Sequence, residues 1–575
     1  MMYFLITERL DPLITFFVGV ILFLVTGIIS VDEAVSGFSN KGVLTLAVIY
    51  MLISALRNSG ALSFIADKIF SKKISDKKQL LRIIFPTTLI SSFVNNIPVV
   101  AAFSSMFMRW SRKHNIQVSK FLIPISFASI FGGICTLIGT STNLVVSGLL
   151  EQFGYKSLGM FDLTPIGIPL AVMGIVYLYF IGYKFIPLRK NIHEQFISDY
   201  NNYLLEMEVT SNCELIGKTV KEANLRNLKG VFLVGLSRDD NIISPISPEE
   251  IIVPDDKLIF TGKIDIIDDL KKIKGLKIIK EAHELMEEMK KDNASFFEAV
   301  ISLNSQLIGK TAKDLGFREK YKAAILAIHR KGKRVISKIG NIKFKPGDVL
   351  FLIADKEFKE RWYRGDDFFH ISRADSKLNI KKGNSIFISI IFLLLLIVAA
   401  FNIMHVLFWA LLALSLIILT KNLSLKEAKE SINLEILVFI ALALGIGKAI
   451  INSGTANFIA GGVYNLIGNM PEFWIYVFVY LLVVILTEMI TNNSAAIITL
   501  PIAIKVALLS GIEVHTIALL VAIAASSSFL TPIGYQTNLI VYGLGNYKFT
   551  DFFKVGLPLT IIFMFGTAGI LTLFF

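Results

Sequence analysis

Cysteine is almost absent from this chain. Its 575 residues include two, Cys135 in an apolar run and Cys213 in a polar region. Two cysteines in such different settings exclude a disulfide framework and a cysteine-based metal site. Histidine is also scarce, at 7 residues, and none lies in the middle of a long apolar run, where it could relay protons. The first residues, "MMYFLITERLD", lack the features of a secretory signal, so we expect no cleaved leader.

Charged residues are few as well, at 18%, whereas apolar residues make up 54% and the mean hydropathy is +0.64. This composition excludes an ordinary soluble protein and predicts an integral membrane protein. Apolar runs suited to a bilayer lie near both ends, for example at 13–29, 386–400, 406–419 and 557–575. They stop between about residues 190 and 384, which predicts a water-soluble insert between two membrane halves. The net charge of +13 is typical of basic cytoplasmic loops, so we expect no nucleic-acid partner.

The two membrane halves share four short motifs in the same order. The pairs are "NSGALSFIA" (58–66) with "NSGTANFIA" (452–460), "VNNIP" with "TNNSA" around Asn95 and Asn492, "GTSTNLVVSGL" with "GYQTNLIVYGL" around Asn143 and Asn538, and "GIPL" with "GLPL" at Gly167 and Gly556. Their offsets are 394, 397, 395 and 389 residues, which indicates a duplicated membrane unit. The run 386–400 has no full counterpart in the first half; either that repeat lost a helix or the chain begins upstream.

Loop charge predicts how the two copies are oriented. The run 83–108 has strongly basic flanks on both sides, so we expect a re-entrant hairpin that enters from the cytoplasm. The matching run 473–509 has nearly uncharged flanks and would enter from outside. The remaining segments then cross in opposite senses, with the insert 190–384 cytoplasmic and the C-terminus outside. The predicted fold class is a polytopic α-helical membrane protein with an inverted-topology repeat, re-entrant hairpins and broken helices, an arrangement typical of secondary transporters.

Polar residues interrupt the apolar runs twice in each half. The interruptions are Asn95–Pro98, Gly139–Asn143, Thr491–Ser494 and Thr531–Asn538. Open backbone at membrane depth is tolerated only inside protein or beside a wet cavity. Oxygens of Asn, Ser, Thr and free carbonyls suit Na⁺, and exposed N–H groups suit an anion. Interhelical hydrogen bonding would explain a lone Ser or Thr, but paired motifs in both halves favour a binding site.

Glu488 is the one carboxylate deep in an apolar run. It is either a coupling carboxylate or a residue at the base of a hairpin near the outer surface, and the sequence leaves both open.

The insert is duplicated too. "LIGKTVKEANLR" at Leu215 matches "LIGKTAKDLGFR" at Leu307, and "VPDDKLIF" matches "KPGDVLFL", both at an offset of 92. Each copy is predicted to contain a strand, a helix and a β-hairpin, and neither has the GxGxxG motif of a dinucleotide site. We expect the charged run 268–291 to form a solvated amphipathic helix between the copies.

The motifs "SSFVNNIPVV", "SFASIFGGICTLIGTSTNLVVSGLL" and "LTEMITNNSAAIITLPIA" resemble the divalent anion:sodium symporter family, in the ion-transporter superfamily that includes arsenite permeases. The insert motifs "LIGKT" and "PGDVLFLI" resemble C-terminal domains of the regulator-of-potassium-conductance (RCK) type, a combination similar to the sulfate-transporter-like branch. The expected domains are membrane repeat 1 (1–189), two α+β RCK C-terminal-like domains (190–285 and 286–372) and membrane repeat 2 (384–575).

The resemblance implies where substrate and sodium bind. In that family a Ser-Asn-Thr motif at each hairpin tip and a broken helix form one sodium site per half, with substrate between the tips. Carried over, the substrate contacts would be Asn95, Asn96, Ile97, Asn492, Asn493 and Ser494, and the sodium ligands Asn96, Thr140, Ser141, Thr142, Asn143, Asn493, Gln536, Thr537 and Asn538. The chain departs from the family by having Asn for the first Ser in both tips and Ile97 in place of a Thr, which leaves the anion unassigned.

The predicted function is sodium-coupled symport of a small divalent anion, sulfate or dicarboxylate with sulfate preferred, across the plasma membrane. We expect no enzyme activity, no cofactor, no metal other than sodium, a homodimer, and an unidentified small ligand of the cytoplasmic domains. Two alternatives stay open: an arsenite, metalloid or other anion permease of the same fold, and a ligand-gated ion channel. The channel lacks support because no filter resembling "TVGYG" is present.

Overall fold

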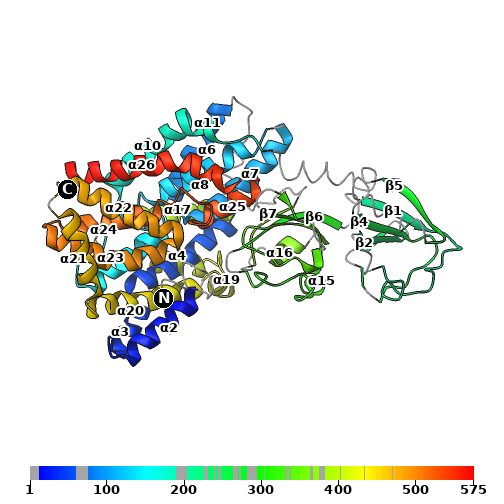
Figure 1. Cartoon of the computed structure of the whole chain (residues 1–575), viewed down its shortest axis with the longest axis horizontal. Helices are drawn as coiled ribbons and strands as arrows, with labels where there is room; N and C mark the ends of the chain where they lie inside the picture. The colour runs from blue at the N-terminus through cyan, green and yellow to red at the C-terminus, as the bar shows by residue number, and fades with distance from the viewer. Residues whose placement is uncertain are drawn as a thin grey trace.

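The computed structural model has a helical part and two β-sheets at one end of it (Figure 1). The structure describes residues 12–59, 76–114, 116–189, 204–281, 294–373 and 382–574, except 226–230, 239–240, 244–245, 248, 263–269, 271–272, 303–304, 331–332, 336–338, 356, 363–366, 402, 433 and 469. Most of the first repeated motif, from residue 60 to 66, lies outside these ranges.

The helices of the first half break close to the predicted interruptions, a few residues earlier in each case. They are α2 (Pro12–Val25), α3 (Val31–Val35), the short η1 (Ser36–Ser39), α4 (Lys41–Asn58), α6 (Asp76–Ser91), α7 (Asn96–His114), α8 (Ser119–Gly133), α9 (Ser141–Gln152), α10 (Thr164–Tyr177), η2 (Leu178–Gly182) and α11 (Tyr183–Phe185). The run 83–108 is thus divided between α6 and α7, and Asn96 begins α7. Pro98 lies in the first turn of α7, where its missing N–H costs no helical hydrogen bond. The second break, 134–140, begins earlier than the predicted Gly139.

The second half repeats this order. Its helices are α17 (Lys382–Ala400), α18 (Val406–Leu419), α19 (Leu425–Glu430), α20 (Leu434–Asn452), α21 (Thr455–Ile467), α22 (Glu472–Met489), α23 (Asn492–Ser510), α24 (Val514–Ser526), α25 (Gln536–Leu544) and α26 (Phe549–Phe574). The breaks fall at 490–491 and 527–535. The predicted interruption Thr531–Asn538 therefore ends one turn too late, because Gln536, Thr537 and Asn538 belong to the first turn of α25.

Equivalent side chains make equivalent contacts in the two halves, with Asn96 as the counterpart of Asn492 at an offset of 396, one residue from the pairing of Asn95 with Asn492 made from the sequence. Ser91 Oγ lies 2.7 Å from the side-chain amide of Asn96, and Thr487 Oγ1 donates to Asn492 Oδ1 at 3.2 Å. Both pairs join the end of one hairpin helix to the start of the next. The duplication read from the sequence is therefore also a duplication of contacts.

Two glycines show the same repetition in backbone packing. A Cβ on Gly167 of α10 would lie 2.5 Å from the carbonyl oxygen of Ile134, and a Cβ on Gly556 of α26 would overlap the carbonyl oxygen of Phe529. Ile134 and Phe529 are 395 residues apart, and each lies in the break of its own half. The fourth repeated motif thus supplies a glycine that lets a long helix pack against the break.

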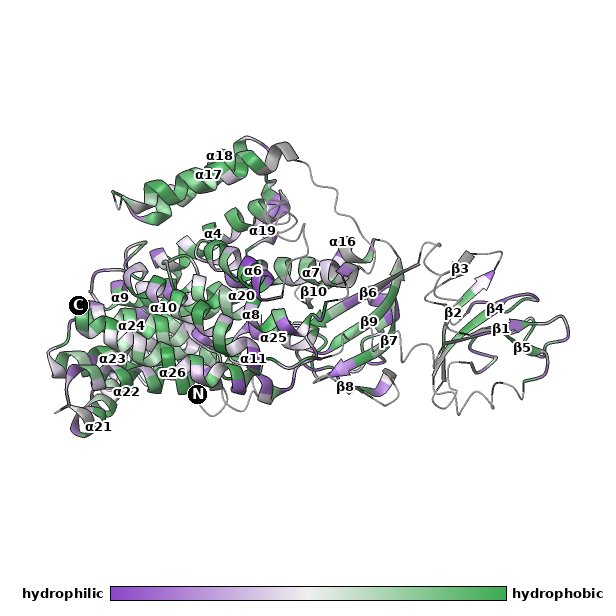
Figure 2. Cartoon of the chain, turned by 90° about the horizontal axis from the view of Figure 1, so that it is seen from above, coloured by the Kyte–Doolittle hydropathy of each residue, from purple (hydrophilic) through white to green (hydrophobic). Residues whose placement is uncertain are grey.

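Within the described residues, six helical segments are long and apolar enough to cross a membrane: 31–56, 164–185, 434–452, 472–489, 492–510 and 549–574. Apolar residues predominate throughout the helical part, and the pair α17–α18 lies along one side of it (Figure 2). Large apolar side chains such as Leu393, Leu394 and Leu412 are exposed on this pair. Exposed apolar surface of this extent is expected of helices that face lipid.

The insert contains two five-stranded sheets with the same strand order. The first is β3 (Asn241–Ile243), β2 (Val231–Arg238), β4 (Lys257–Gly262), β1 (Leu204–Val209) and β5 (Leu276–Glu281); the second is β8 (Lys333–Arg334), β7 (Ala323–Arg330), β9 (Val349–Asp355), β6 (Ala294–Ile301) and β10 (Phe368–Arg373). Short helices α15 (Phe317–Tyr321), η4 (Ile339–Asn341) and α16 (Phe358–Trp362) accompany the second sheet. The predicted duplication of the insert is confirmed in strand order.

One ion pair recurs at the same place in both copies. Arg238 donates from Nε and Nη2 to the carboxylate of Asp256 at 2.7 and 2.8 Å, and Arg330 does the same to Asp348 at 2.7 and 2.7 Å. Both aspartates are buried, and each residue of the first pair lies 92 positions before its counterpart in the second pair. The hydrogen bond to Asp348 raises the pKa of Arg330, so the guanidinium group keeps its charge.

The prediction of a linker helix over 268–291 is wrong within the described residues. Leu276–Glu281 forms strand β5, which pairs antiparallel with β1, while 282–293 lies outside the described ranges. β5 is at the edge of its sheet, where Lys277 is exposed and Leu276 is buried. Lysines on an edge strand discourage further strand pairing, and they gave this segment its helix-like mixture of charged and apolar residues.

The second sheet packs directly on the helical part. A Cβ on Gly347, which has a φ of +75°, would lie 2.9 Å from the side chain of Leu539, and one on Gly543 would lie 3.0 Å from the Gly347 carbonyl oxygen. Val349 of β9 also approaches Gly543 closely. Because Leu539 and Gly543 belong to α25, the turn before β9 rests on one of the broken helices. Strand β10 contacts α7 in addition.

Candidate functional site

The hairpins and broken helices of the two halves cross over. Helix α7 of the first half packs against α25 of the second, and α23 of the second packs against α9 of the first. Asn96 and Asn492 begin the hairpin helices, and Ser141 and Gln536 begin the short broken ones. Contacts between these first turns bring helix N-termini from both halves together. Because the N–H groups there have no intrahelical partner, the N-terminal ends carry partial positive charge and favour anions.

Tyr535 lies at the centre of this crossing. Its hydroxyl is 3.0 Å from Thr140 Oγ1 and 2.6 Å from the side-chain amide of Asn96. Thr140 and Tyr535 are the N-cap residues of α9 and α25, at equivalent positions 395 apart. The two broken helices therefore touch through the same position of each half.

The second hairpin tip contacts the broken helix of the first half. Asn493 Oδ1 accepts hydrogen bonds from Thr142 Oγ1 at 3.0 Å and from Ser141 Oγ at 3.3 Å. The structure therefore brings Asn493 to two predicted site residues that lie more than 350 positions away in the sequence.

Among the described hydrogen bonds, those of Asn95 and Ser494 stay within their own hairpin tips. The Asn95 side chain accepts from the Ile97 N–H at 3.3 Å, and Ser494 Oγ lies 2.8 Å from Thr491 Oγ1. Ile97 packs against the apolar core of the helical part. These residues shape the tips, and the hydrogen bonds from each tip to the opposite half come from Asn96 and Asn493.

Asn143 and Asn538 are fully buried and hold the breaks in place. The Asn143 amide donates to the carbonyl oxygens of Gly133 and Thr136 at 3.0 and 2.9 Å. The Asn538 amide makes the equivalent bonds at 2.9 and 3.2 Å, to Ser528 and Thr531.

The side-chain oxygens of Asn143 and Asn538 differ in their hydrogen-bond partners. Asn538 Oδ1 accepts from Ser126 Oγ at 2.7 Å, whereas Asn143 Oδ1 has no hydrogen-bond partner among the described residues. Ser126 also donates to Thr537 Oγ1 at 3.0 Å. An unpartnered buried oxygen is costly in a packed interior, and a cation would satisfy it.

Glu488 stabilises the break of the second half. Its carboxylate accepts from the N–H groups of Leu530 at 2.9 Å and Thr531 at 3.0 Å. The equivalent residue of the first half is Ser92, so no second carboxylate matches it. The described geometry gives Glu488 a role in fixing the loop.

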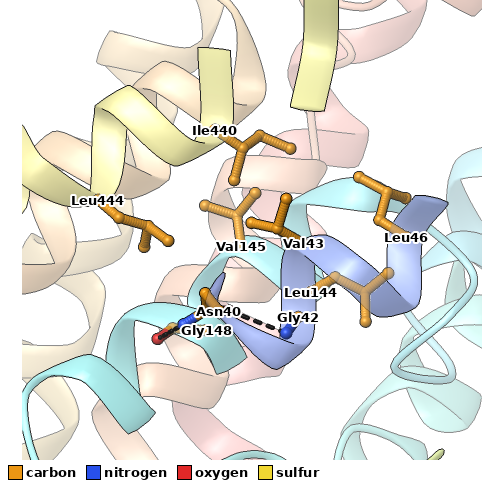
Figure 3. Close-up of a pocket in the computed structure, with 9 residues that line it drawn as sticks. All are labelled: Asn40, Gly42, Val43, Leu46, Leu144, Val145, Gly148, Ile440 and Leu444. Carbon is orange, nitrogen blue, oxygen red and sulfur yellow. Dashed lines mark hydrogen bonds between the residues drawn. The ribbon is translucent and has the colours of Figure 1, made fainter. Parts of the chain in front are cut away.

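A narrow cleft lies further along α9 (Figure 3). It is lined by Asn40, Gly42, Val43, Leu46, Leu144, Val145, Gly148, Ile440 and Leu444. Asn40 bridges it, donating to the Gly148 carbonyl oxygen at 3.0 Å and accepting from Gly42 N–H at 2.8 Å. The cleft has no room for a water molecule, so it marks close packing of α4, α9 and α20 and is distinct from the polar crossing.

Metal-ligating clusters of three or more His, Cys, Asp or Glu side chains are absent from the part of the chain that the structure describes. Cys135 and Cys213 are buried free thiols.

Sequence reasoning missed two of the central residues. Tyr535 lies inside a predicted interruption, and its alignment with Thr140 was the available signal. Ser126 lies within α8 on an uninterrupted apolar helix, and no pattern distinguishes it from other membrane serines.

Comparison with known proteins identifies the family. The family model described as "Citrate transporter" matches residues 2–524. The chain belongs to the citrate transporter family. A protein of Chlamydomonas reinhardtii named "Putative sulfur deprivation response regulator" is 31% identical, over 98% of both chains. An uncharacterized transporter of Synechocystis is 29% identical, over 95% of this chain and 91% of the relative. A "Probable sodium/sulfate cotransporter 3" of C. reinhardtii is 23% identical, over 95% of this chain and 84% of the relative.

Membership of the citrate transporter family makes the chain a multi-pass membrane transporter and not an enzyme. This confirms the family and the class of function predicted from the hairpin and broken-helix motifs. The RCK resemblance of the insert stays a prediction.

Proposed function

We propose that this chain is a sodium-coupled symporter of a small divalent anion, with sulfate as the preferred substrate. The observation that carries the proposal is the crossing of hairpin tips and broken helices at Thr140, Tyr535, Asn96 and Asn493. Helix N-termini and hydroxyl groups there offer donors to an oxyanion, which has only acceptors. The sodium/sulfate cotransporters among the relatives support the same substrate class.

Sodium would bind beside the breaks. The unpartnered Oδ1 of Asn143 supports a first site, because a hard cation prefers oxygen ligands. Ser126 already satisfies the equivalent oxygen of Asn538. The remaining predicted ligands lie at the starts of the same broken helices or at the two hairpin tips: Asn96, Thr140, Ser141, Thr142, Asn493, Gln536 and Thr537.

The orientation of the halves is part of the proposal. Re-entry of α6–α7 from the cytoplasm and of α22–α23 from outside would make the repeat inverted, as the loop charges predict. The insert is then cytoplasmic, the C-terminus is outside, and the protein lies in the plasma membrane, where we expect a homodimer.

The test is uptake of radiolabelled sulfate into proteoliposomes. With an inward sodium gradient we expect accumulation that disappears when potassium replaces sodium and when an ionophore collapses the gradient. Protein-free liposomes are the control. The proposal is refuted if uptake of sulfate, succinate and citrate is in each case independent of the sodium gradient.

Citrate is the second candidate substrate, because the matching family model is named for it. Measured in the same liposomes, sodium-driven citrate uptake exceeding that of sulfate would select it.

A further inference from the structure

We propose that Tyr535 limits the size of the anion that this transporter accepts. Its phenol ring fills the space between the two broken helices, so that a small inorganic oxyanion fits there and a carbon-chain dicarboxylate does not. This inference rests on the proposed function, because it concerns the substrate of the same site.

The first argument is the difference between the halves. Thr140 occupies the position in α9 that Tyr535 occupies in α25, and each caps its helix. A threonine at both positions would leave the volume of an aromatic ring unfilled at the crossing. Tyr535 is 8% exposed and Thr140 is 4% exposed, so the ring is enclosed by protein.

The second argument is that the ring is held in place from two sides. Asn96 satisfies all its polar atoms when its Oδ1 faces Tyr535 and accepts the phenol proton at 2.6 Å. Its Nδ2 then donates to Ser91 Oγ at 2.7 Å and to the Ser129 carbonyl oxygen at 3.1 Å. The Tyr535 oxygen is left to accept from Thr140, so moving the ring aside breaks bonds to α7 and to α9 together.

The third argument concerns the ligand. Sulfate is compact and tetrahedral, and the hydroxyl and N–H donors around the crossing can surround it. A dicarboxylate has two charged ends separated by carbon atoms and needs a longer cavity. The ring lies between the elements that would have to contact both ends, namely the tip at Asn96 and the broken helix at Thr140.

The test compares two variants in sodium-driven uptake of radiolabelled sulfate, with succinate as competitor. Tyr535→Thr makes the two halves alike, and we expect succinate to half-inhibit uptake at a concentration at least about tenfold lower than in the parent protein, as for the removal of a steric barrier in a pocket. Tyr535→Phe keeps the ring, so we expect succinate exclusion to persist while sulfate uptake slows. Tyr542→Thr, a change of the same kind at a buried tyrosine on the same helix, should leave succinate competition unchanged.

The outcomes separate the two proposals. If the parent protein takes up sulfate and Tyr535→Thr still excludes succinate, the inference about Tyr535 fails and the proposed function stands. If Tyr535→Phe admits succinate, the hydroxyl and not the ring controls size, and the inference also fails. If the parent protein takes up no anion in a sodium-driven manner, both the proposed function and the inference about Tyr535 fail. If Tyr535→Thr does not yield folded protein, Tyr535→Leu replaces it, because leucine is apolar and smaller than tyrosine. Succinate should then also half-inhibit sulfate uptake at a lower concentration than in the parent protein.

Discussion

The duplicated ion pair of the insert allows a matched experiment on how the insert affects transport. Arg330→Ala and Arg238→Ala remove the same side chain from the same place in the two copies. In each case the aspartate keeps one backbone donor, at 2.9 Å, and loses both guanidinium bonds. The two variants should therefore damage their own copies to a similar degree, although Arg238→Ala also removes an ion pair with Glu250 at 3.0 Å.

The size of the effect follows from burial. Asp348 is 1% exposed and Asp256 is fully buried. Removing one partner of a buried pair costs about 3–5 kcal/mol. The side chains of Arg330 and Arg238 are 24% and 30% exposed, so the loss should lie near the lower end, about 3 kcal/mol. That is a large share of the roughly 5–15 kcal/mol that stabilises a typical domain.

The two copies should nevertheless differ in their effect on transport. The second sheet rests on α25 and contacts α7, both of which carry residues of the proposed site. The first copy meets the second through Arg318, whose guanidinium donates to the Leu233 carbonyl oxygen at 3.4 Å. We expect Arg330→Ala to lower sodium-driven uptake severalfold and Arg238→Ala to lower it much less.

The assay has two readouts. Limited proteolysis of the purified protein reports whether each copy has loosened, and uptake per folded molecule reports transport. The double variant Arg330→Met/Asp348→Leu is the control, because replacing both partners by apolar residues leaves no buried charge and should restore much of the stability. Equal loss of uptake in the two arginine variants would refute the reasoning, as would full uptake in Arg330→Ala when proteolysis shows the second copy loosened.

Three further predictions concern the helical part. Asn96→Ala and Asn493→Ala each remove contacts between halves worth about 1 kcal/mol, so the sodium concentration for half-maximal uptake should rise about fivefold before expression falls; unchanged sodium dependence would contradict the site. The pKa of Asp162 is lowered chiefly by the hydrogen bond from His515, at 3.3 Å. A lowered folded-state pKa gives stability that is present above the unfolded value of about 3.9 and is lost as pH falls through the folded value. Asp162→Asn should therefore reduce the fall of the melting temperature at acidic pH. The same fall in the variant and the parent protein would argue against a stabilising Asp162–His515 pair. Gly167→Ala should lower the melting temperature, since its new Cβ would meet a backbone carbonyl at 2.5 Å and overpacking costs about 1–3 kcal/mol.

Much of the fold could be predicted from the sequence because its signals are local. Asn-Asn pairs and the Gly-Thr-Ser-Thr-Asn stretch interrupt apolar runs, and polar breaks of this kind end helices at membrane depth. Repetition at an offset of 395 then related the two halves. The starts of α7 and α23 were therefore predictable from a few letters.

The rest depends on contacts that no local pattern encodes. Strand β5 was mistaken for a helix because its partner β1 is about 70 residues away and supplies the hydrogen bonds that decide its conformation. Likewise, Ser126 meets Asn538 over 412 positions, and only the fold brings them together. Thr140 and Tyr535 align as equivalent positions, but alignment does not reveal that they touch.

The turn at Gly347 has a mechanical consequence. Because it is wedged against α25 while β10 contacts α7, the second sheet has to share any displacement of those helices. A fluorophore attached to that sheet would thus report a movement of α7 and α25 as a change in its distance from a second fluorophore on the helical part.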